Sequence, residues 1–366
     1  MDFIFTDDQR QLRDALRGYL ARNNGFSVRT ATARSASGWS DSLWRGLAGD
    51  LGILGLLAPE AARGIGGNAT DMMVVMEELG ANLLVEPYLE TAVIGASAFG
   101  AAHAAELAGI ATGDLRIAFA WAEAGTRFDR LPRDTIALRT TVGWRLDGGK
   151  IVVTAAPMAT HFLVTARIGD EPALFLVEAG ATGISQHAFP TIDGRRAADV
   201  TLDAVAVPDG ALVARGGEAI ERLCDIATAM LGAEALGVMR VMLDDTIAFT
   251  KERRQFGQAI ASFQVLQHRM VDMYMQLELA TSAVYRAVLS LDAEPVERAR
   301  AVSAMKVMVA AACRFIGQNA IQLHGGMGMT DEVAVTHYFR RATVIESEFG
   351  SADWHRRRFA ALSRAA

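Results

Sequence analysis

The sequence predicts a mostly helical protein with a β domain in the middle of the chain. Three observations predict this fold class: helical periodicity through the first ~115 residues, short runs rich in Val, Ile, Thr and Phe after Asp114, and helical periodicity again from Gly217 onward. With 366 residues and a 51% hydrophobic composition, the chain is long enough for two or three domains and too apolar for disorder. The expected domain boundaries are 1–115, 116–212 and 213–366.

Helices are expected throughout the first domain. Thr6 and Gln9 have the spacing of a capping box and should begin the first helix. The apolar stretch 92–111 contains His103 and Glu106, so we expect a buried helix there and no membrane span. The helical segments expected in this domain are Leu12–Leu20, Trp44–Leu51, Thr70–Leu79 and Glu90–Gly109.

The middle domain is expected to be β. Its short apolar runs follow one another without helical segments between them, which favours an antiparallel sheet or a small barrel. The step Asp147-Gly148-Gly149 has the composition of a hairpin turn and should separate two strands. The expected strands are Ile117–Trp121, Thr135–Val142, Trp144–Leu146, Lys150–Thr154, His161–Arg167, Ala173–Val177 and Asp199–Val207.

The third domain is expected to be a helical bundle, because long periodic segments follow one another with few helix breakers. Cys224 and Cys313 lie in apolar helical contexts without metal-ligand spacing, so we expect buried thiols in a reducing compartment, with neither a disulfide nor a metal site. The expected helices are Ile220–Glu252, Ala261–Leu291, Glu297–Leu323, Glu332–Val344 and Asp353–Ala365.

The charge balance argues against nucleic acid as a partner. Lys+Arg 36 and Asp+Glu 42 give a net charge of −6, and the three lysines, Lys150, Lys251 and Lys306, leave 33 arginines that are scattered without a basic run. The segment Met1–Gln9 has an acidic pair where a signal peptide needs a basic region. We therefore expect a cytoplasmic protein without membrane insertion.

A basic and aromatic segment ends the first long helix of the third domain. Its residues are Glu252-Arg253-Arg254-Gln255-Phe256-Gly257, and the polar cluster Gln264–His268 follows one loop later. Guanidinium groups beside an exposed aromatic ring and a glycine could hold a pyrophosphate and cover an aromatic cofactor ring. The alternative is a solvated basic helix end that complements the helix dipole.

A glycine-rich segment follows a later helix, with the residues Gln322-Leu323-His324-Gly325-Gly326-Met327-Gly328-Met329. Three glycines in four positions bring backbone N–H groups to the surface, where anions bind. The alternative is a glycine-rich cap before the helix expected near Asp331.

Together these two segments resemble the acyl-CoA dehydrogenase family of flavoproteins, in which an R-x-x-F-G segment and a Q-x-L-G-G-x-G segment occur in this order. The resemblance extends from the opening Phe5-Thr6-Asp7-Asp8-Gln9 to the turn Phe349-Gly350-Ser351 before the last helix. It implies that family's fold, with an N-terminal helical domain, a middle β-barrel or sheet domain and a C-terminal four-helix bundle, and it implies FAD. The implied cofactor contacts are Arg253, Gln255, Phe256, Gln264, Gln322, His324, Gly325, Gly326, Thr154, Ala122, Ser351 and Asp353.

The resemblance also implies α,β-dehydrogenation of an acyl-CoA thioester. In this reaction a carboxylate removes the α-proton, the β-hydride passes to flavin N5, and an electron-transfer flavoprotein accepts the electrons. In most relatives the base directly precedes Gly350, where this chain has Phe349, and in a smaller group it falls on Ala227. Neither side chain can take a proton, so Glu348 and other nearby acids are left as possible bases. The implied substrate contacts are Asp225, Phe349 and Gly350.

The segments that contact the flavin ring in the family also differ in this chain. The family's Tyr-x-x-Thr-Glu-Pro strand is Phe119-Ala120-Trp121-Ala122-Glu123-Ala124 here, and Val152 replaces a tryptophan two residues before Thr154. Thr154 is expected to reach flavin N5. The segments that serve a neighbouring subunit's flavin are kept best, as in the small subunits of unlike α2β2 dehydrogenases that act on dicarboxylyl-, pimeloyl- or steroid side-chain-CoA.

The expected partner is therefore a homologous acyl-CoA dehydrogenase subunit, or a second copy of this chain in a dimer of dimers. Two alternatives stay open. One is a self-sufficient homotetramer that uses Glu348 or another nearby acid as its base, and the other is a catalytically silent scaffold of the same fold.

Overall fold

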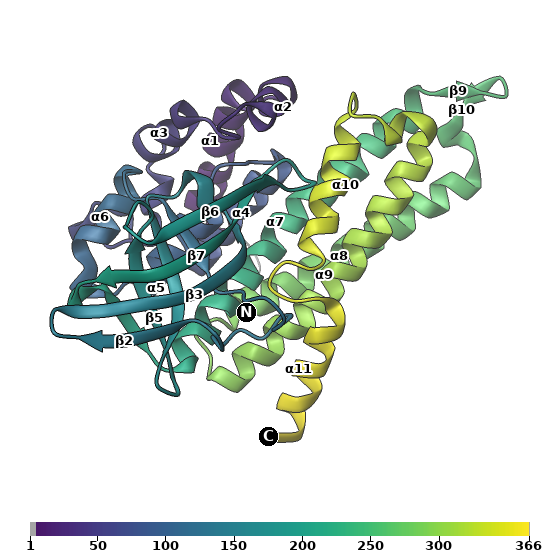
Figure 1. Cartoon of the computed structure of the whole chain (residues 1–366). Helices are drawn as coiled ribbons and strands as arrows, with labels where there is room; N and C mark the ends of the chain where they lie inside the picture. Colours follow the sequence, from purple (N-terminus) through teal and green to yellow (C-terminus); the bar gives the residue numbers. More distant parts are fainter. Residues whose placement is uncertain (1–4, 366) are drawn as a thin grey trace. The chain divides into compact units, whose positions relative to one another are not determined.

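Residues 5–365 are described by a computed structural model of the chain, shown in Figure 1. By its internal contacts the chain divides into two units. The helical unit contains the described parts of Met1–Arg29, Met73–Leu84 and Thr228–Ala366, and the sheet unit contains Thr30–Met72 and Val85–Ala227. Met1–Ile4, the first part of the N-terminal segment with the acidic pair, lies outside the described residues.

The helical unit is built around one long helix, α9 (Pro295–His324), which has buried residues along its whole length. Its neighbours are α8 (Gln264–Leu289), α10 (Ala334–Ile345) and α11 (Ala352–Ala365). The unit also contains α1 (Asp7–Asn23) and, from Thr228 onward, α7 (Gly217–Glu252). The predicted capping box is confirmed, since Thr6 and Gln9 make both of its hydrogen bonds. The five helices predicted for the last third of the chain are confirmed within a few residues of their predicted ends.

Two glycines let α4 (Ala69–Ala81) and α7 approach backbone to backbone. A Cβ added to Gly80 would lie 2.0 Å from the carbonyl oxygen of Glu234, and one added to Gly237 would lie 1.9 Å from the carbonyl oxygen of Glu77. Both distances are far below van der Waals contact. Only glycine therefore fits at this crossing.

The sheet unit contains one eight-stranded sheet in the order β6-β7-β3-β2-β4-β5-β8, with β1 paired to β4. Because β1 runs parallel to β4, the sheet is mixed; of the two expected forms, an antiparallel sheet or a small barrel, the antiparallel sheet is not found. Its largest buried side chains include Phe162 and Phe175. The strands are β1 (Ile117–Ala120), β2 (Ile136–Thr140), β3 (Gly143–Thr154), β4 (His161–Ile168), β5 (Glu171–Glu178), β6 (Ile184–Pro190), β7 (Arg196–Val207) and β8 (Leu212–Arg215).

The predicted hairpin at Asp147-Gly148-Gly149 is wrong, because β3 runs through this step as one strand. The chain reverses earlier, at Thr140–Gly143, and the register of β3 with β7 shifts between Leu146 and Gly148. Gly148 has φ 151°, and a Cβ there would lie 2.6 Å from the Cα of Thr135. Gly148 therefore lets the backbone of Thr135 approach β3 closely next to a bulge.

The apolar stretch 92–111 is also not one helix. A π-helical segment, η3 (Leu89–Gly95), continues as α5 (Ala96–Ala98), and the chain is extended at Phe99 and Gly100 before α6 (Ala104–Thr112). The sequence missed α2 (Phe26–Arg34), β6 and β8, whereas α3 (Asp41–Gly49) was predicted. The 3₁₀ turns are η1 (Ile53–Gly55), η2 (Glu60–Ala62), η4 (Ala101–His103), η5 (Ala156–Met158), η6 (Asp209–Ala211), η7 (Ile260–Ser262) and η8 (Gly325–Met329).

Among the described helices, only α7 is long and apolar enough, by length and composition, to cross a membrane, and 89% of its apolar window is buried in the protein. Cys224 and Cys313 are free and buried, as predicted, and burial raises the pKa of the Cys313 thiol to about 12. Within residues 5–365, no group of three or more His, Cys, Asp or Glu side chains could hold a metal ion.

Candidate functional site

The basic and aromatic segment forms a hairpin of β9 (Arg254–Gln255) and β10 (Gln258–Ala259), which projects beyond the ends of α7 and α8 (Figure 1). The two turn residues have positive φ, 54° at Phe256 and 80° at Gly257, as in a type I′ turn. Phe256 is 89% exposed, and Arg253, Gln255 and Gln264 are exposed beside it. The hairpin thus presents an aromatic ring and cationic side chains to solvent.

The glycine-rich segment forms the turn η8 at the end of α9. Gly325 has φ 63°, and its N–H donates to the carbonyl oxygen of Gln322. A Cβ added to Gly325 or Gly326 would meet no atom within 4 Å. Gln322 is exposed as well. The open face of this turn leaves room for a ligand to approach the backbone.

A ring stack joins the hairpin to the glycine turn. The ring of His324, at the end of α9, stacks on that of Phe249 in α7, with centroids 4.4 Å apart. The backbone N–H of Arg253 donates to the carbonyl oxygen of Phe249 at 2.9 Å. Two motifs about 70 residues apart in sequence therefore share one support.

A buried lysine holds the turn between α10 and α11. Lys306 is 1% exposed, and its Nζ donates to the carbonyl oxygens of Ile345 at 2.5 Å and Glu348 at 2.6 Å. A cation at the C-terminal end of a helix also complements the helix dipole. Lys306 therefore joins the end of α10 to the residue before Phe349.

A buried histidine holds the next carbonyl of this turn. His355 Nε2 donates to the carbonyl oxygen of Phe349 at 3.2 Å, since that oxygen can only accept, and Nδ1 lies 3.2 Å from Ser303 Oγ. Phe349 is 8% exposed and has φ 57°, which non-glycine residues rarely adopt. Gly350 follows with φ 121°. The backbone of Phe349, the residue at the predicted base position, is thus held by a hydrogen bond to its own carbonyl and by another to the carbonyl before it.

Glu348 lies in an ion-pair network. Its Oε2 accepts from Arg341 Nη1 at 3.0 Å, and Arg341 also donates to both carboxylate oxygens of Glu234 at 2.6 and 2.8 Å. The Glu348 side chain is 14% exposed. One of its two oxygens is therefore committed to a guanidinium donor.

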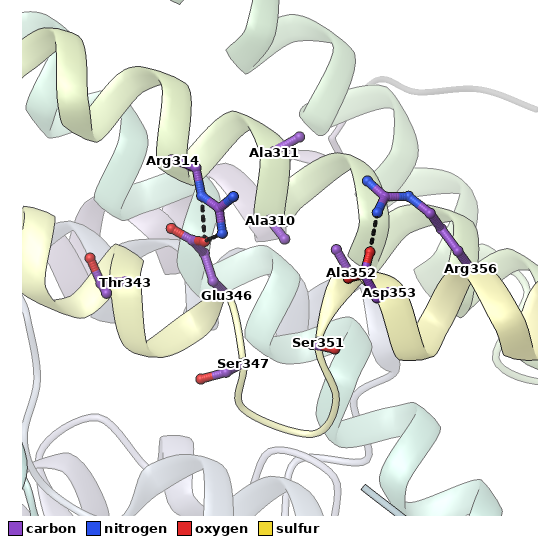
Figure 2. Close-up of a pocket in the computed structure, with 10 residues that line it drawn as sticks. All are labelled: Ala310, Ala311, Arg314, Thr343, Glu346, Ser347, Ser351, Ala352, Asp353 and Arg356. Atoms are coloured by element: carbon purple, nitrogen blue, oxygen red, sulfur yellow. Dashed lines mark hydrogen bonds and ion pairs between the residues drawn. The ribbon is translucent and has the colours of Figure 1, made fainter. Parts of the chain in front are cut away.

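Figure 2 shows a pocket of about 300 Å³ among α9, α10 and α11. Two predicted cofactor contacts, Ser351 and Asp353, line it beside Ser347. Glu346 pairs with Arg314, and Asp353 pairs with an arginine one turn along α11. The pocket is lined by Ala310, Ala311, Arg314, Thr343, Glu346, Ser347, Ser351, Ala352, Asp353 and Arg356.

In the sheet unit, the predicted substrate contact Asp225 lies in a buried ion pair. Arg130 Nη1 donates to Asp225 Oδ1 at 2.7 Å and to Glu221 Oε2 at 2.9 Å. Arg130 is 1% exposed and Asp225 is fully buried. The structure therefore gives Asp225 a guanidinium partner inside the protein.

A second buried ion pair lies beside the predicted cofactor contact Ala122. Lys150 Nζ donates to Glu123 Oε1 at 2.8 Å and to Thr165 Oγ1 at 2.9 Å. Three backbone N–H groups, of Arg133, Asp134 and Thr135, also donate to the Glu123 carboxylate. Both members of the pair are at most 2% exposed. Ala122 itself accepts from the N–H of Ile151 at 2.9 Å.

A bulge in β3 precedes Thr154, the last residue of that strand. The register with β7 shifts between Lys150 and Val153, and Val152 has φ 49°. Asp199 Oδ1, on β7, accepts from the N–H of Val152 at 2.9 Å. Thr154 is half-buried and pairs with Ala197. The bulge therefore lies between the Lys150 anchor and the predicted flavin contact.

The Glu123 carboxyl should control acid stability. Burial alone would raise its pKa, but the attraction of Lys150 and hydrogen bonds lower the pKa to about 2 from 4.5. A carboxyl whose pKa is lower in the folded state stabilises the fold above about pH 4.5, and this contribution is lost as the pH falls toward about 2. We expect the double variant Glu123→Gln/Lys150→Met, a neutral pair, to lose less of its Tm than the unmodified protein between about pH 5 and pH 2.5. Thermal melts with the same pH dependence in both proteins would contradict this.

Sequence reasoning missed the side chains that hold these segments. Lys150, Glu123, Lys306, His355 and Asp199 were not predicted to act at the site. The rarity of lysine was one sequence signal for buried cations, because only three of the 36 Lys and Arg residues are lysines. In the structure, Lys150 and Lys306 are each 1% exposed. A compact ammonium group has three donors, which can reach several separate acceptor oxygens at once.

The described residues fit a flavin dinucleotide in each unit taken separately. In the helical unit, the open backbone at Gly325 and Gly326 and the exposed Phe256 suit a phosphate and an aromatic ring. In the sheet unit, Val152 is 53% exposed at a strained bulge beside Thr154.

Three family models match the chain in succession. They are the acyl-CoA dehydrogenase N-terminal domain over residues 6–106, the middle domain over 118–205 and the C-terminal domain over 214–362. The chain therefore belongs to the acyl-CoA dehydrogenase family, which consists of FAD-dependent oxidoreductases, and the predictions of family, fold class and cofactor are confirmed.

Individual relatives cover nearly the whole chain. The chain is 27% identical to the acyl-CoA dehydrogenase IpdE2 of Mycolicibacterium smegmatis, with 92% of this chain and 93% of the relative covered. It is 29% identical to the benzylmalonyl-CoA dehydrogenase of Aromatoleum aromaticum, with 94% and 95% covered. Among solved structures, a variant of the Tcur3481-Tcur3483 steroid ACAD has a TM-score of 0.91 at 30% identity and covers 98% of both chains. The ChsE4-ChsE5 complex from Mycobacterium tuberculosis has a TM-score of 0.93 at 26% identity over 100% of both chains.

Proposed function

We propose that this chain is a subunit of a two-subunit acyl-CoA dehydrogenase and completes a flavin site with a homologous partner. The observation that carries the proposal is Phe349, which lies where the resemblance expects the base. The carbonyl of Phe349 accepts from His355, and the preceding carbonyl, of Glu348, accepts from Lys306. A phenyl group cannot take the α-proton. The base is therefore expected on the partner subunit.

The exposed motifs of the helical unit support this assignment. Arg253, Phe256 and the backbone of Gly325 and Gly326 would hold the phosphates and an aromatic ring of a flavin bound mainly by the partner. Bound FAD supplies the hydride acceptor of the reaction. This chain's Thr154 would donate its hydroxyl hydrogen toward a flavin, and Ser351 and Asp353 would line a cofactor pocket.

The relatives give this proposal a precedent. Two of the similar solved structures carry paired names, Tcur3481-Tcur3483 and the ChsE4-ChsE5 complex. The caffeyl-CoA reductase-Etf complex subunit CarC of Acetobacterium woodii is 28% identical to this chain, over 82% of this chain and 84% of the relative. We therefore propose an electron-transfer flavoprotein as the electron acceptor and an acyl-CoA as the substrate. We also propose that the protein is located in the cytoplasm.

The test compares the chain alone with the chain co-expressed with homologous partner subunits. Visible flavin absorbance is recorded, and acyl-CoA thioesters are added without oxygen. We expect substrate-dependent bleaching only with a partner. Bleaching by the chain alone would overturn the proposal and favour a self-sufficient homotetramer, in which Glu348→Gln should then abolish bleaching. A colourless complex with every partner would instead indicate a silent scaffold.

Arg253 provides a more local prediction. In the coloured complex, Arg253→Gln should weaken FAD binding about 10-fold or more, because it removes a charge-assisted hydrogen bond to phosphate. Arg254→Gln, one residue along the same exposed hairpin, is the matched control and should change FAD affinity by less than about 3-fold. Equal affinities of the two variants in flavin titrations would show that Arg253 does not hold the cofactor.

A further inference from the structure

We propose that Asp199 and the Lys150–Glu123 pair are positioning residues for the flavin ring, which act by fixing the β3 bulge at Val152 and the backbone of Ala122. This inference rests on the proposed function, because it takes Ala122 and Thr154 as flavin contacts. It assigns a role to three side chains that do not themselves reach the cofactor.

The first argument is backbone strain. Val152 is β-branched and has φ 49°, a conformation in which such residues are genuine outliers. Val152 is 53% exposed, so burial within this chain does not offset the strain. Strained residues persist only where their surroundings fix them, and they concentrate at functional sites. Here the fixing contact is the hydrogen bond from the Val152 N–H to Asp199 Oδ1.

The second argument is the anchor on the other side of the bulge. Lys150, two residues before Val152, turns inward to Glu123, Thr165 and the carbonyl oxygen of Trp121. The N–H of Ile151, between them, donates to the carbonyl oxygen of Ala122 at 2.9 Å. The bulge is therefore tied to Ala122 through the backbone and through a buried ion pair. These contacts hold the segments of Ala122 and Thr154, the two predicted flavin contacts of the sheet unit, in one arrangement.

The sheet contains a second device of the same kind, which provides an internal control. Ala204 on β7 has φ 53°, and its N–H donates to Asp147 Oδ1 on β3 at 2.8 Å. This bulge follows the register shift between Leu146 and Gly148. None of the predicted flavin contacts lies beside it in the register of β3 and β7. Asp199 and Asp147 thus each accept a hydrogen bond from the N–H of a bulge residue with positive φ, at different places in the sheet.

The experiment measures FAD affinity, the visible spectrum of bound flavin and the Tm of the cofactor-free protein. Asp199→Ala should weaken FAD binding about 10-fold and shift the flavin spectrum, whereas Asp199→Asn, which keeps an oxygen acceptor, should restore both. Asp147→Ala should change the Tm about as much as Asp199→Ala does and leave flavin binding unchanged. Equal flavin affinities for the two alanine variants would overturn the inference.

A second variant separates positioning from stability. Val152→Gly relieves the left-handed strain, so the Tm of the cofactor-free protein should stay the same or rise. FAD affinity should fall about 10-fold, because glycine no longer holds the bulge in one conformation. A Val152→Gly protein with unchanged flavin affinity and spectrum would also overturn the inference. If the unmodified chain binds no flavin with any partner, the proposed function itself has failed.

Discussion

Gly237→Ala is expected to destabilise the helical unit by about 3 kcal/mol or more, because the new methyl group would meet backbone. Its carbon would lie 1.9 Å from the carbonyl oxygen of Glu77 and 2.6 Å from the backbone nitrogen of Ala81. Neither atom can move unless α4 moves as a whole. We expect a fall in Tm of about 10 °C, or no folded protein.

The matched control is Gly232→Ala on the same helix. A Cβ there would meet the Sδ of Met305 at 2.6 Å, and a flexible side chain can turn away. Alanine also favours the helix by about 1 kcal/mol over glycine. The Tm of this variant should therefore stay within a few degrees of that of the unmodified protein. Equal losses in the two variants would show that the α4–α7 crossing is not what requires glycine.

Arg341→Met is expected to destabilise the protein by about 3–5 kcal/mol, since it leaves the carboxylate of Glu234 buried without its cation. Both side chains are at most 3% exposed, and the guanidinium makes two hydrogen bonds to Glu234. The substitution also releases Glu348 Oε2. Denaturant unfolding of the purified variant measures the change in free energy.

Two variants make this prediction specific. Arg314→Met removes an arginine from the Glu346 ion pair, but Arg314 is 67% exposed, so the loss should stay below about 1 kcal/mol. The double variant Arg341→Met/Glu234→Gln removes the buried charge as well and should recover part of the lost stability. If Arg314→Met is as damaging as Arg341→Met, burial of the charge is not the cause.

Local patterns predicted most of the helical elements. The apolar spacing of α7 to α11 and the Thr6–Gln9 capping box depend on residues a few positions apart, so the sequence shows them directly. The motifs at Arg253 and Gly325 are likewise local, so the sequence shows them directly. The order of the segments was enough to indicate the family, which the comparisons confirm.

Local sequence patterns gave wrong predictions where pairing with a distant strand determines the backbone conformation. Asp147-Gly148-Gly149 has the composition of a turn, but its pairing with β7 makes it a continuous stretch of strand opposite a bulge in β7. The mixed character of the sheet likewise depends on β1 meeting β4. Local composition carries no information about either partner.

The sequence by itself determined the family and the order of helical and β segments, and it predicted that Phe349 stands where most relatives have the base. Only the tertiary structure decided several further contacts. His355 holds the carbonyl of that phenylalanine and Lys306 holds the carbonyl before it, Arg130 pairs with Asp225, and Asp199 accepts from the bulge before Thr154. The physical reason is that a buried charge or a strained backbone needs a partner at hydrogen-bond distance. For these groups the partner lies between 6 and 95 residues away in the chain, where no local spacing rule reaches.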